Sequence, residues 1–454
     1  MLDRSKSSSV AREVVLRPEV FAGRRRLFMD AIGTRAAAIF PAAPTAIRSN
    51  DVEYPYRSDN DLLYLTGFSE PEAVCVLLPG HPEEEFVMFV LPRDPERETW
   101  TGRRAGVEGA LAAFGAQRAY PIEQLDQKIA ELVGERDQLY YRFDRHEAFN
   151  ARVIGWMRQW HRLRPRSGKG PVAILDPGQV IHELRLRKGS EEVSLMRRAA
   201  EIAVEAHLGA MRAAQPGMFE FEIEAMIDST FRRHGASGPA YPSIVASGEN
   251  ATILHYTANN RRIQAGDLLL IDAGAEYGNY CSDVTRTFPV RGGYRPEQRA
   301  IDERVLAAQQ AAIAAVRPGS PYDEPHRRAL DVLVDGLREL AILKGERGEL
   351  LESEAYKPFY MHRTSHWLGM DVHDVGSYRT GDTCRVLEPG MVLTVEPGLY
   401  FSGDCQVVPA EYRGIGVRIE DDVLVTPEGC EVLTSAAPKS WAEMEEITRS
   451  GGGC

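Results

Sequence analysis

The sequence predicts an α/β domain followed by an α+β domain. In the first ~170 residues, short apolar runs alternate with helix-like stretches, as in an α/β domain built on a small sheet. The second half opens with long amphipathic segments and then carries strand-like runs at 268–288, 390–396 and 414–426. Between the halves, the Pro- and Gly-rich stretch "RLRPRSGKGP" is typical of a linker. We therefore predict domains at 1–172 and 173–445, and a flexible tail at 446–454.

The individual elements follow from their composition. The apolar runs of the first domain are "AAAIF", "LLYLTGF", "AVCVLL" and "FVMFVLP", and a helix is predicted at 122–135. In the second domain, Ser190 and the acids after it begin an amphipathic helix that ends at "QPG", residues 215–217. Further helices are predicted at 220–234 and over "EQRAIDERVLAAQQAAIAAV".

The composition limits the class of protein. With 454 residues, 43% hydrophobic and 26% charged, the chain is typical of soluble globular proteins. A net charge of -12 argues against nucleic acid as a partner, because such binding requires an excess of Lys and Arg. No stretch approaches the ~18 apolar residues of a membrane span. The N-terminus "MLDRSKSSSVAREVV" lacks the apolar core of a secretory signal.

The six cysteines have no regular spacing and form no CxxC pair. This pattern predicts isolated reduced thiols, and with them a cytoplasmic location. The residues are Cys75, Cys281, Cys384, Cys405, Cys430 and Cys454.

The stretch "LLLIDAGAEYGNYCSDVTRTF", residues 268–288, has the pattern of a β-hairpin with two aspartates in otherwise apolar strands. With Tyr277 and Gly278 as the central turn residues, Asp272 is directly opposite Asp283. Cross-strand partners have Cβ atoms ~5 Å apart, so the two carboxylates repel unless a proton or cation lies between them. The alternative is a pair of turn-flanking aspartates capped by backbone N–H groups.

Three histidines lie within "MHRTSHWLGMDVHDVG". Gly369 and its β-leaning neighbours argue against a helix, so we expect His362 and His366 to share one face of an extended strand. His373 follows in the same segment. The alternative is a set of unrelated surface histidines.

Two further strands end in charged residues. In "GMVLTVEPGLY", Pro397 holds Glu396 in an extended conformation, although a glutamate at such a place could also face solvent. In "GIGVRIEDDVLVT", Arg418 and Glu420 alternate with apolar residues and share one face. A surface ion pair is the alternative for this strand.

The four carboxylates and one imidazole together suit a metal centre. Their total charge of about -4 balances two divalent cations, and oxygen-rich ligation favours Mn²⁺, with Zn²⁺ or Co²⁺ as alternatives. A water molecule bridging two such ions is a source of hydroxide at neutral pH, so the reaction class is hydrolysis. The residues are Asp272, Asp283, His366, Glu396 and Glu420.

These segments resemble the successive motifs of the dinuclear-metal "pita-bread" peptidases, and most closely those of bacterial aminopeptidase P, the Xaa-Pro aminopeptidases. The resemblance covers residues 45–435 and includes "SGENATILHYT", "HELRLRKGSEEV" and "DVEYPYRSDNDLLYLTGFSEPEA". It implies a creatinase-like N-terminal domain and a pita-bread catalytic domain. It also implies release of the first residue from a peptide with proline second, by attack of a metal-bridging hydroxide.

The resemblance assigns a role to each ligand. Asp272 would chelate one metal, and Asp283 and Glu420 would bridge both. His366 and Glu396 would hold the other metal, and Glu396 or a histidine would pass a proton to the prolyl nitrogen.

Other roles concern the substrate. By similarity, His373 stabilises the tetrahedral intermediate, and His255 and His362 position the substrate or assist proton transfer. Arg418 resembles the family arginine beside the metals, where its charge would keep the carboxylates ionised. Tyr400 is a candidate wall for the proline ring.

The resemblance also implies a homodimer or homotetramer. Asp51 and Trp100 match family positions that reach a neighbouring subunit's active site. An ordinary turn aspartate and a packed tryptophan are the alternatives.

Two other functions remain open. Prolidase, which cleaves Xaa-Pro dipeptides, shares all five ligands. A non-catalytic pita-bread binding protein would be expected to have lost ligands, whereas every ligand position is filled here.

Overall fold

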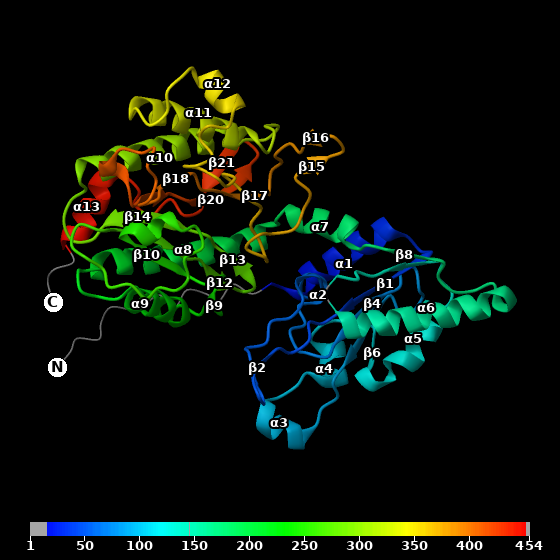
Figure 1. Cartoon of the computed structure of the whole chain (residues 1–454). Helices are drawn as coiled ribbons and strands as arrows, with labels where there is room; N and C mark the ends of the chain where they lie inside the picture. Colours follow the sequence, from blue (N-terminus) through cyan, green and yellow to red (C-terminus); the bar gives the residue numbers. More distant parts are fainter. Residues whose placement is uncertain (1–15, 145, 451–454) are drawn as a thin grey trace. The chain divides into compact units, whose positions relative to one another are not determined.

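The computed structural model describes residues 16–144 and 146–450 (Figure 1). The described chain forms an N-terminal unit ending at Arg185 and a C-terminal unit beginning at Leu186. The predicted boundary near residue 172 lies too early. Strand β8 (Ala173–Leu175) is the last strand of the N-terminal sheet, and α7 (Gly178–Leu186) follows it.

The stretch predicted as a linker is largely helical. Helix α6 (Glu147–Ser167) runs through it with Pro165 in its last turn, and Gly168 ends the helix with φ 68°. A proline near a helix end followed by a left-handed glycine is a helix-termination signal, so the composition marks the end of α6. The predicted tail is also helical up to residue 450, in α13 (Trp441–Ser450), and residues 451–454 lie outside the described range.

The N-terminal unit is an α/β domain, as predicted. Its six-stranded sheet has the order β6-β5-β4-β1-β7-β8, in which β1, β7 and β8 are parallel. Besides β8, the strands are β1 (Ala36–Pro41), β4 (Val74–Leu77), β5 (Phe86–Val90), β6 (Arg118–Pro121) and β7 (Gln138–Tyr140), and β2 (Ile47–Ser49) and β3 (Val52–Glu53) form a separate hairpin.

Helices cover this sheet with apolar faces. Helices α5 (Leu125–Val133) and α6 contribute to the core against β1, β4 and β5. The run "LLYLTGF" forms most of helix α2 and its C-terminal cap instead of a strand, because Asp59 caps the start of the helix by accepting hydrogen bonds from the N–H groups of Asp61 and Leu62. The remaining helices are α1 (Pro18–Ile32), α2 (Asn60–Thr66), α3 (Pro95–Thr101) and α4 (Gly106–Ala112).

In the C-terminal unit, short sheets lie between two helix pairs (Figure 1). Helices α8 (Ser190–Ala213), α9 (Glu220–Arg233) and α10 (Pro296–Ala315) match the predicted ones closely. The other helices are α11 (Glu324–Glu339), α12 (Arg347–Glu352) and α13. The α+β prediction is confirmed for this unit.

The strands of the C-terminal unit form several small sheets, the main ones being β10-β11-β14 and β17-β20-β21. The bounds are β9 (Gly238–Pro239), β10 (Ile244–Ser247), β11 (Leu268–Asp272), β12 (Ala275–Tyr277), β13 (Tyr280–Cys281), β14 (Thr285–Pro289), β15 (Arg379–Thr380), β16 (Thr383–Cys384), β17 (Val392–Val395), β18 (Gly398–Phe401), β19 (Ile415–Arg418), β20 (Asp421–Thr426) and β21 (Gly429–Val432).

Two apolar cores hold these layers together. One packs α8 and α9 against β11 and β14, and the other packs α10 and α11 against β17 and β20. Because each sheet buries one face under a helix pair, polar residues at the strand ends are left between the two sheets.

The predicted hairpin at 268–288 forms with a different register. Tyr277 pairs with Tyr280, so the two central turn residues are Gly278 and Asn279. Both have positive φ, 58° and 66°. Left-handed conformations at both positions define the type I′ turn that suits the twist of a hairpin, and glycine and asparagine adopt them most readily.

The shift changes the pairing of the aspartates. Asp272 lies opposite Thr285, and Asp283 is two residues from Thr285 in the same chain segment. The prediction of direct opposition is therefore wrong. The two aspartates are diagonal neighbours, which still share a face.

Helix α10 buries a carboxyl group that has no ion-pair partner among the described residues. Asp302 is 1% exposed, its Oδ1 lies 3.5 Å from the Tyr294 hydroxyl, and its Oδ2 has no hydrogen-bond partner in the described chain. Burial raises the pKa of Asp302 to about 8. The group is therefore protonated in the folded protein at neutral pH.

We expect Asp302→Asn to stabilise the protein above pH 4. The folded state binds a proton that the unfolded state releases, so Asp302 costs stability increasingly as the pH rises from about 4 to about 8. The free energy of unfolding of the variant should exceed the parent's by a few kcal/mol at pH 8 and match it at pH 4, because one pKa unit is worth about 1.4 kcal/mol. Denaturant unfolding at a series of pH values measures this. An equal difference at both pH values would contradict it.

The described cysteines agree with the prediction of isolated thiols. Cys75, Cys281, Cys384, Cys405 and Cys430 are free thiols, and Cys454 lies outside the described residues. Over residues 16–144 and 146–450, no helix combines the length and the apolar character that crossing a membrane would need.

Candidate active site

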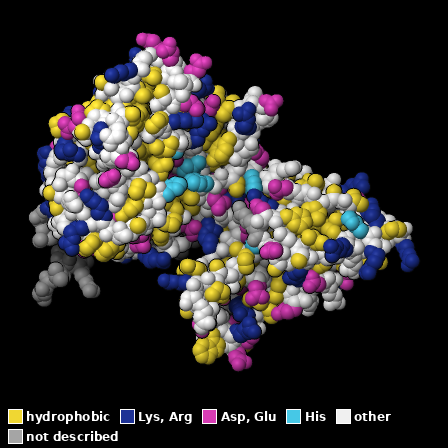
Figure 2. Space-filling model, in the orientation of Figure 1, with side chains coloured by type: hydrophobic (Ala, Val, Ile, Leu, Met, Phe, Trp, Pro, Cys, Tyr) yellow, Lys and Arg dark blue, Asp and Glu magenta, His cyan; other side chains and the backbone are white. Residues whose placement is uncertain are grey.

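A cavity of about 500 Å³ opens in the C-terminal unit. Pro242, Ile244, Leu254 and Val372 provide apolar wall. Its polar lining contains all five predicted metal ligands, three further histidines and one arginine, namely Asp272, Asp283, His366, Glu396, Glu420, His255, His362, His373 and Arg418. Figure 2 shows histidine side chains gathered on the face of this unit.

Strand ends bring the four carboxylates together. Asp272 ends β11 and Asp283 lies just before β14, while Glu396 follows β17 and Glu420 lies between β19 and β20. At Glu396 the chain continues without a turn. It passes directly from β17 to β18, which belong to different sheets, and so the carboxylate lies where the sheets meet.

The imidazole comes from an irregular segment. Residues 361–378 contain no strand, so the expected extended strand is wrong, although the expected absence of a helix is confirmed. Backbone hydrogen bonds fix the segment against β17. The N–H of Thr394 donates to the carbonyl of His366, and the N–H of Leu368 donates to the carbonyl of Val392. Both His362 and His366 therefore still reach the cavity.

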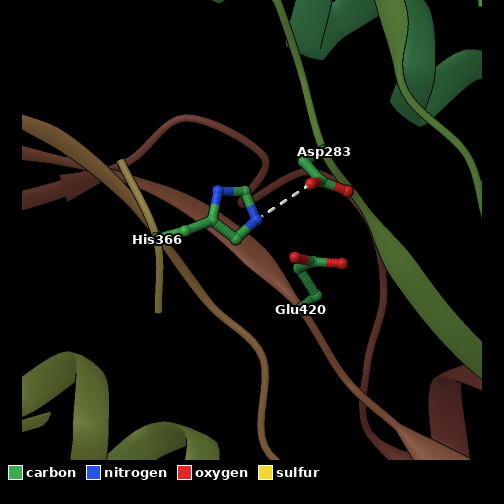
Figure 3. Close-up of side chains that lie close together, drawn as sticks. All are labelled: Asp283, His366 and Glu420. Carbon is green, nitrogen blue, oxygen red and sulfur yellow. Dashed lines mark ion pairs between the residues drawn. The ribbon is translucent and has the colours of Figure 1, made fainter. Parts of the chain in front are cut away.

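The structure brings Asp283, His366 and Glu420 within metal-ligand distance of one another. One ligand atom from each lies within 4.8 Å of the others, and the three side chains point toward a common centre (Figure 3). His366 Nε2 lies 3.3 Å from Asp283 Oδ2 and 3.7 Å from Glu396 Oε1. Three of the five predicted ligands are thus close enough to one another to share a metal ion.

The tautomer of His366 suits a metal ligand. Its Nδ1 lies 3.0 Å from the backbone carbonyl of Trp367, and this contact requires Nδ1 to carry the proton. Nε2, which faces the carboxylates, is then the nitrogen that would lose its proton and donate its lone pair to a metal. Metal-binding histidines generally hold their second nitrogen in this way.

Arg418 belongs to the site. Its Nη2 lies 2.6 Å from Asp272 Oδ2, and the arginine side chain is 4% exposed. A surface ion pair, the alternative for this strand, is therefore wrong. Burial would lower the pKa of Arg418, but Tyr400 and the carboxylates outweigh it and keep the guanidinium charged.

The pKa values show how much negative charge is concentrated here. Burial and the repulsion from other carboxylates raise the pKa of Glu420 well above its ordinary value, and burial chiefly raises that of Glu396 to about 7. Burial also raises the pKa of Asp272, against the opposing charge of Arg418. For His366, burial acts to lower the pKa, but Asp283 and Glu396 raise it to about 9. The donor set therefore fits divalent cations, which would offset this charge.

The structure places Tyr400 behind the cavity and not in its wall. The side chain is 2% exposed, and its hydroxyl lies 2.8 Å from His362 Nε2 and 3.1 Å from Arg418 Nη1. The prediction that Tyr400 walls the proline ring is not supported by this lining, and the residue instead fixes two neighbours that do line the cavity. Burial, followed by the charge of Arg418, lowers the pKa of His362 to about 4.

His373 and His255 also line the cavity. The His373 ring lies edge-on to His366, with 4.4 Å between ring centroids. Burial and the neighbouring His366 lower the pKa of His373, so its imidazole is neutral at neutral pH.

Three residues of the site were missed by the sequence interpretation. The Tyr241 hydroxyl donates to both Asp272 Oδ1, at 2.6 Å, and Asp283 Oδ1, at 2.5 Å. The Thr285 hydroxyl donates to Glu420 Oε2 at 2.6 Å, and the Asp422 carboxylate accepts from the N–H of Asp283 at 3.2 Å. Side chains alternate between the two faces of a strand, so Thr285 could have been expected on the same face as Asp283, two residues before it. No feature of the sequence near Tyr241 indicates that it belongs to the site.

Asp51 and Trp100 belong to the N-terminal unit, where both are exposed. Trp100 is 86% exposed. The alternative of a packed tryptophan is therefore wrong. Asp51 lies in the turn between β2 and β3.

Two family models match the chain. Metallopeptidase family M24 matches residues 194–427, and the aminopeptidase P N-terminal domain matches residues 21–140. The two matches lie on either side of the boundary between the units.

Relatives and solved structures match over nearly the whole chain. The Xaa-Pro aminopeptidase of Escherichia coli strain K12 is 43% identical over 94% of this chain and 97% of its own length. The structure of Pseudomonas aeruginosa aminopeptidase PepP has 48% identity and a TM-score of 0.94, covering 96% of this chain and 99% of that one. A variant of Escherichia coli aminopeptidase P in complex with substrate has 42% identity and a TM-score of 0.93, covering 96% and 99%.

Proposed function

The chain belongs to metallopeptidase family M24 and is an Xaa-Pro aminopeptidase, and from this premise we propose how its residues carry out the reaction and which metal it uses. The enzyme releases the first residue of a peptide whose second residue is proline. Aminopeptidase activity is thus favoured over prolidase activity and over a binding protein without catalysis.

The convergence of Asp283, His366 and Glu420 carries the proposal. With Asp272 and Glu396 they would hold two divalent cations, and Mn²⁺ is the proposed metal because four of the five ligands donate oxygen. Zn²⁺ and Co²⁺ are the alternatives, and one of the similar structures is a zinc-substituted Escherichia coli aminopeptidase P in complex with product. When bound, such ions lower the pKa of a water molecule and polarise a carbonyl group.

The chain's own groups would bind and move protons. Glu396 or a histidine would take up a proton and pass it to the prolyl nitrogen, which has no N–H of its own. His373 would donate a hydrogen bond to the carbonyl oxygen as negative charge develops there. His255 and His362 would position the peptide, and Arg418 holds Asp272.

Substrate length and metal removal test this proposal. We expect cleavage of an Xaa-Pro-Xaa tripeptide at a rate far above that of the Xaa-Pro dipeptide, loss of activity on chelation and recovery with Mn²⁺. Product release measured by chromatography, with metal content measured in parallel, gives both results. Turnover of the dipeptide alone would contradict the aminopeptidase activity, and full turnover without metal would contradict the metal centre.

We also propose that the chain forms homodimers or homotetramers through the N-terminal unit. The support is a group of exposed large apolar side chains that includes Trp100 at 86%, Ile47 at 58%, Tyr54 at 54% and Val52 at 53%. Large exposed apolar side chains of this kind are common at protein interfaces. Sedimentation velocity should show a shift to smaller species on Trp100→Glu, and a monomeric parent would contradict the proposal.

A cytoplasmic location is proposed on the support of the free thiols of the described chain. Fractionation of cells with an antibody to the protein tests it. Recovery in a secreted or periplasmic fraction would contradict it.

A further inference from the structure

We propose that a buried ion pair between Lys188 and Asp374 positions His373 in the active site. The inference rests on the role proposed above for His373. Lys188 lies at the start of the C-terminal unit, just before α8, and Asp374 directly follows His373. Neither Lys188 nor Asp374 lines the cavity, so the pair would act on the active site through His373, which does.

The pair is more deeply buried than an ordinary ion pair. Lys188 Nζ lies 2.9 Å from Asp374 Oδ2, and both side chains are 1% exposed. Removing two charges from water is costly, and apolar residues of similar volume often give equal or greater stability. The pair is therefore better suited to fixing one arrangement of the chain than to stabilising the fold.

The fixed arrangement is a closed loop from His366 to Asp374. The N–H of Asp374 donates to the carbonyl of Trp367 at 2.8 Å, and the N–H of Gly369 donates to Asp371 at 3.1 Å. The N–H of Asp371 also lies 3.4 Å from Asp374 Oδ1. The Asp374 carboxylate thus contacts both its own loop and Lys188.

Gly369 is fitted to this carboxylate. A Cβ atom at this position would lie 2.1 Å from Asp374 Oδ2 and 2.9 Å from Lys188 Cε. Because no real Cβ makes so short a contact, any other residue would displace the ion pair.

Two backbone bonds connect the loop and the lysine to the rest of the site. The N–H of Lys188 donates to the carbonyl of Gly390, two residues before β17, and the N–H of Cys281 donates to the carbonyl of Gly369. The loop is therefore held between the hairpin that carries Asp283 and the strand that leads to Glu396. With both ends fixed, the His373 ring is held edge-on to His366.

Kinetics of the manganese-loaded enzyme with an Xaa-Pro-Xaa tripeptide test this inference. We expect Asp374→Asn to lower kcat about tenfold with KM changed by less than about twofold, because small displacements of a group that acts in the transition state affect kcat selectively. Metal content should not change. In a His373→Ala background, Asp374→Asn should lower kcat by less than about twofold further, because the two residues act as one unit.

Glu388→Gln is the matched control. Glu388 pairs with Arg187, the residue before Lys188, at 2.8 Å, and these side chains are 40% and 42% exposed. This control should have the parental kcat. If Asp374→Asn does not fold, Lys188→Met/Asp374→Leu removes both charges together, leaves no unpaired buried charge, and should show the same loss of kcat.

The results of these experiments distinguish a failure of this inference from a failure of the role proposed for His373. A parental kcat for Asp374→Asn, or an equal loss in the presence and absence of His373, would overturn this inference and leave the proposed function intact. A parental kcat for His373→Ala would contradict the role proposed for His373, and this inference with it.

Discussion

Asp283→Ala is expected to lower kcat/KM for an Xaa-Pro-Xaa tripeptide by at least about a thousandfold while the protein stays folded. Asp283 lies among His366, Glu420 and the Tyr241 hydroxyl, and a small apolar side chain replaces none of these interactions. A metal ion that stabilises the charge developing in the transition state contributes several kcal/mol to catalysis. Loss of a ligand that holds the ion should therefore reduce kcat/KM by a factor of this size.

The thermal stability of the metal-free protein, in contrast to its activity, should not fall in this variant. In the metal-free protein the Asp283 carboxylate raises the pKa of Asp272 and Glu420, which shows that it repels them. Its removal relieves this repulsion, so the Tm of the metal-free variant should equal or exceed that of the metal-free parent.

Steady-state kinetics, thermal unfolding and metal analysis check both parts of this prediction. Glu276→Ala is the control, since Glu276 lies in the same hairpin, in β12, and does not line the cavity. It should keep the parental kcat/KM. A large fall in Tm for Asp283→Ala would mean that loss of activity reflects unfolding and would contradict the prediction.

Arg286→Met is expected to lower the free energy of unfolding by about 3–5 kcal/mol. Arg286 Nη2 lies 2.6 Å from Asp421 Oδ1, and both side chains are 0% exposed. Nε donates to the carbonyl of Pro438 at 2.9 Å, and Nη1 donates to the carbonyl of Glu420. Breaking one half of a buried pair leaves an uncompensated charge in the interior, which is why the expected cost is so large.

Asp421 would remain partly compensated. Lys439 Nζ and Gln309 Nε2 each lie 2.7 Å from its Oδ2. Burial acts to raise the pKa of Asp421, but Arg286 and Lys439 outweigh it and lower the pKa. The expected destabilisation therefore lies within the ordinary range for a buried pair and not above it.

Denaturant unfolding measures the effect, and Arg197→Met is the control. Arg197 makes a bidentate pair with Glu431 at 3.0 and 2.7 Å, with side chains 43% and 42% exposed. An exposed pair contributes at most about 1 kcal/mol. Equal losses for the two variants would contradict the distinction between the buried and the exposed pair.

The sequence predicted which side chains meet in the cavity better than it predicted the geometry that brings them together. Asp272, Asp283, Glu396 and Glu420 could be found because each interrupts or ends an apolar strand, and such an interruption needs a compensating partner. The predicted centre of the hairpin turn was one residue too early. Two placements of the turn in "EYGNY" fit the sequence pattern, and the left-handed conformations of Gly278 and Asn279 decide between them.

Non-local contacts could not be predicted. Tyr241 is separated from Asp283 by 42 positions, and Lys188 from Asp374 by 186, so no local pattern connects them. The segment at 361–378 adopts an irregular path that its tertiary bonds impose, and its composition alone suggested a strand. The stretch at 162–171 was misread because proline and glycine mark helix ends as well as linkers.

The raised pKa values of Glu396 and Glu420 mean that protons and metal ions compete for the same oxygen atoms. Loading the centre near neutral pH must therefore expel protons into the solvent, and the apparent metal affinity must rise with pH until the carboxylates are all ionised. We therefore expect both the metal content and the activity of the enzyme to fall as the pH is lowered.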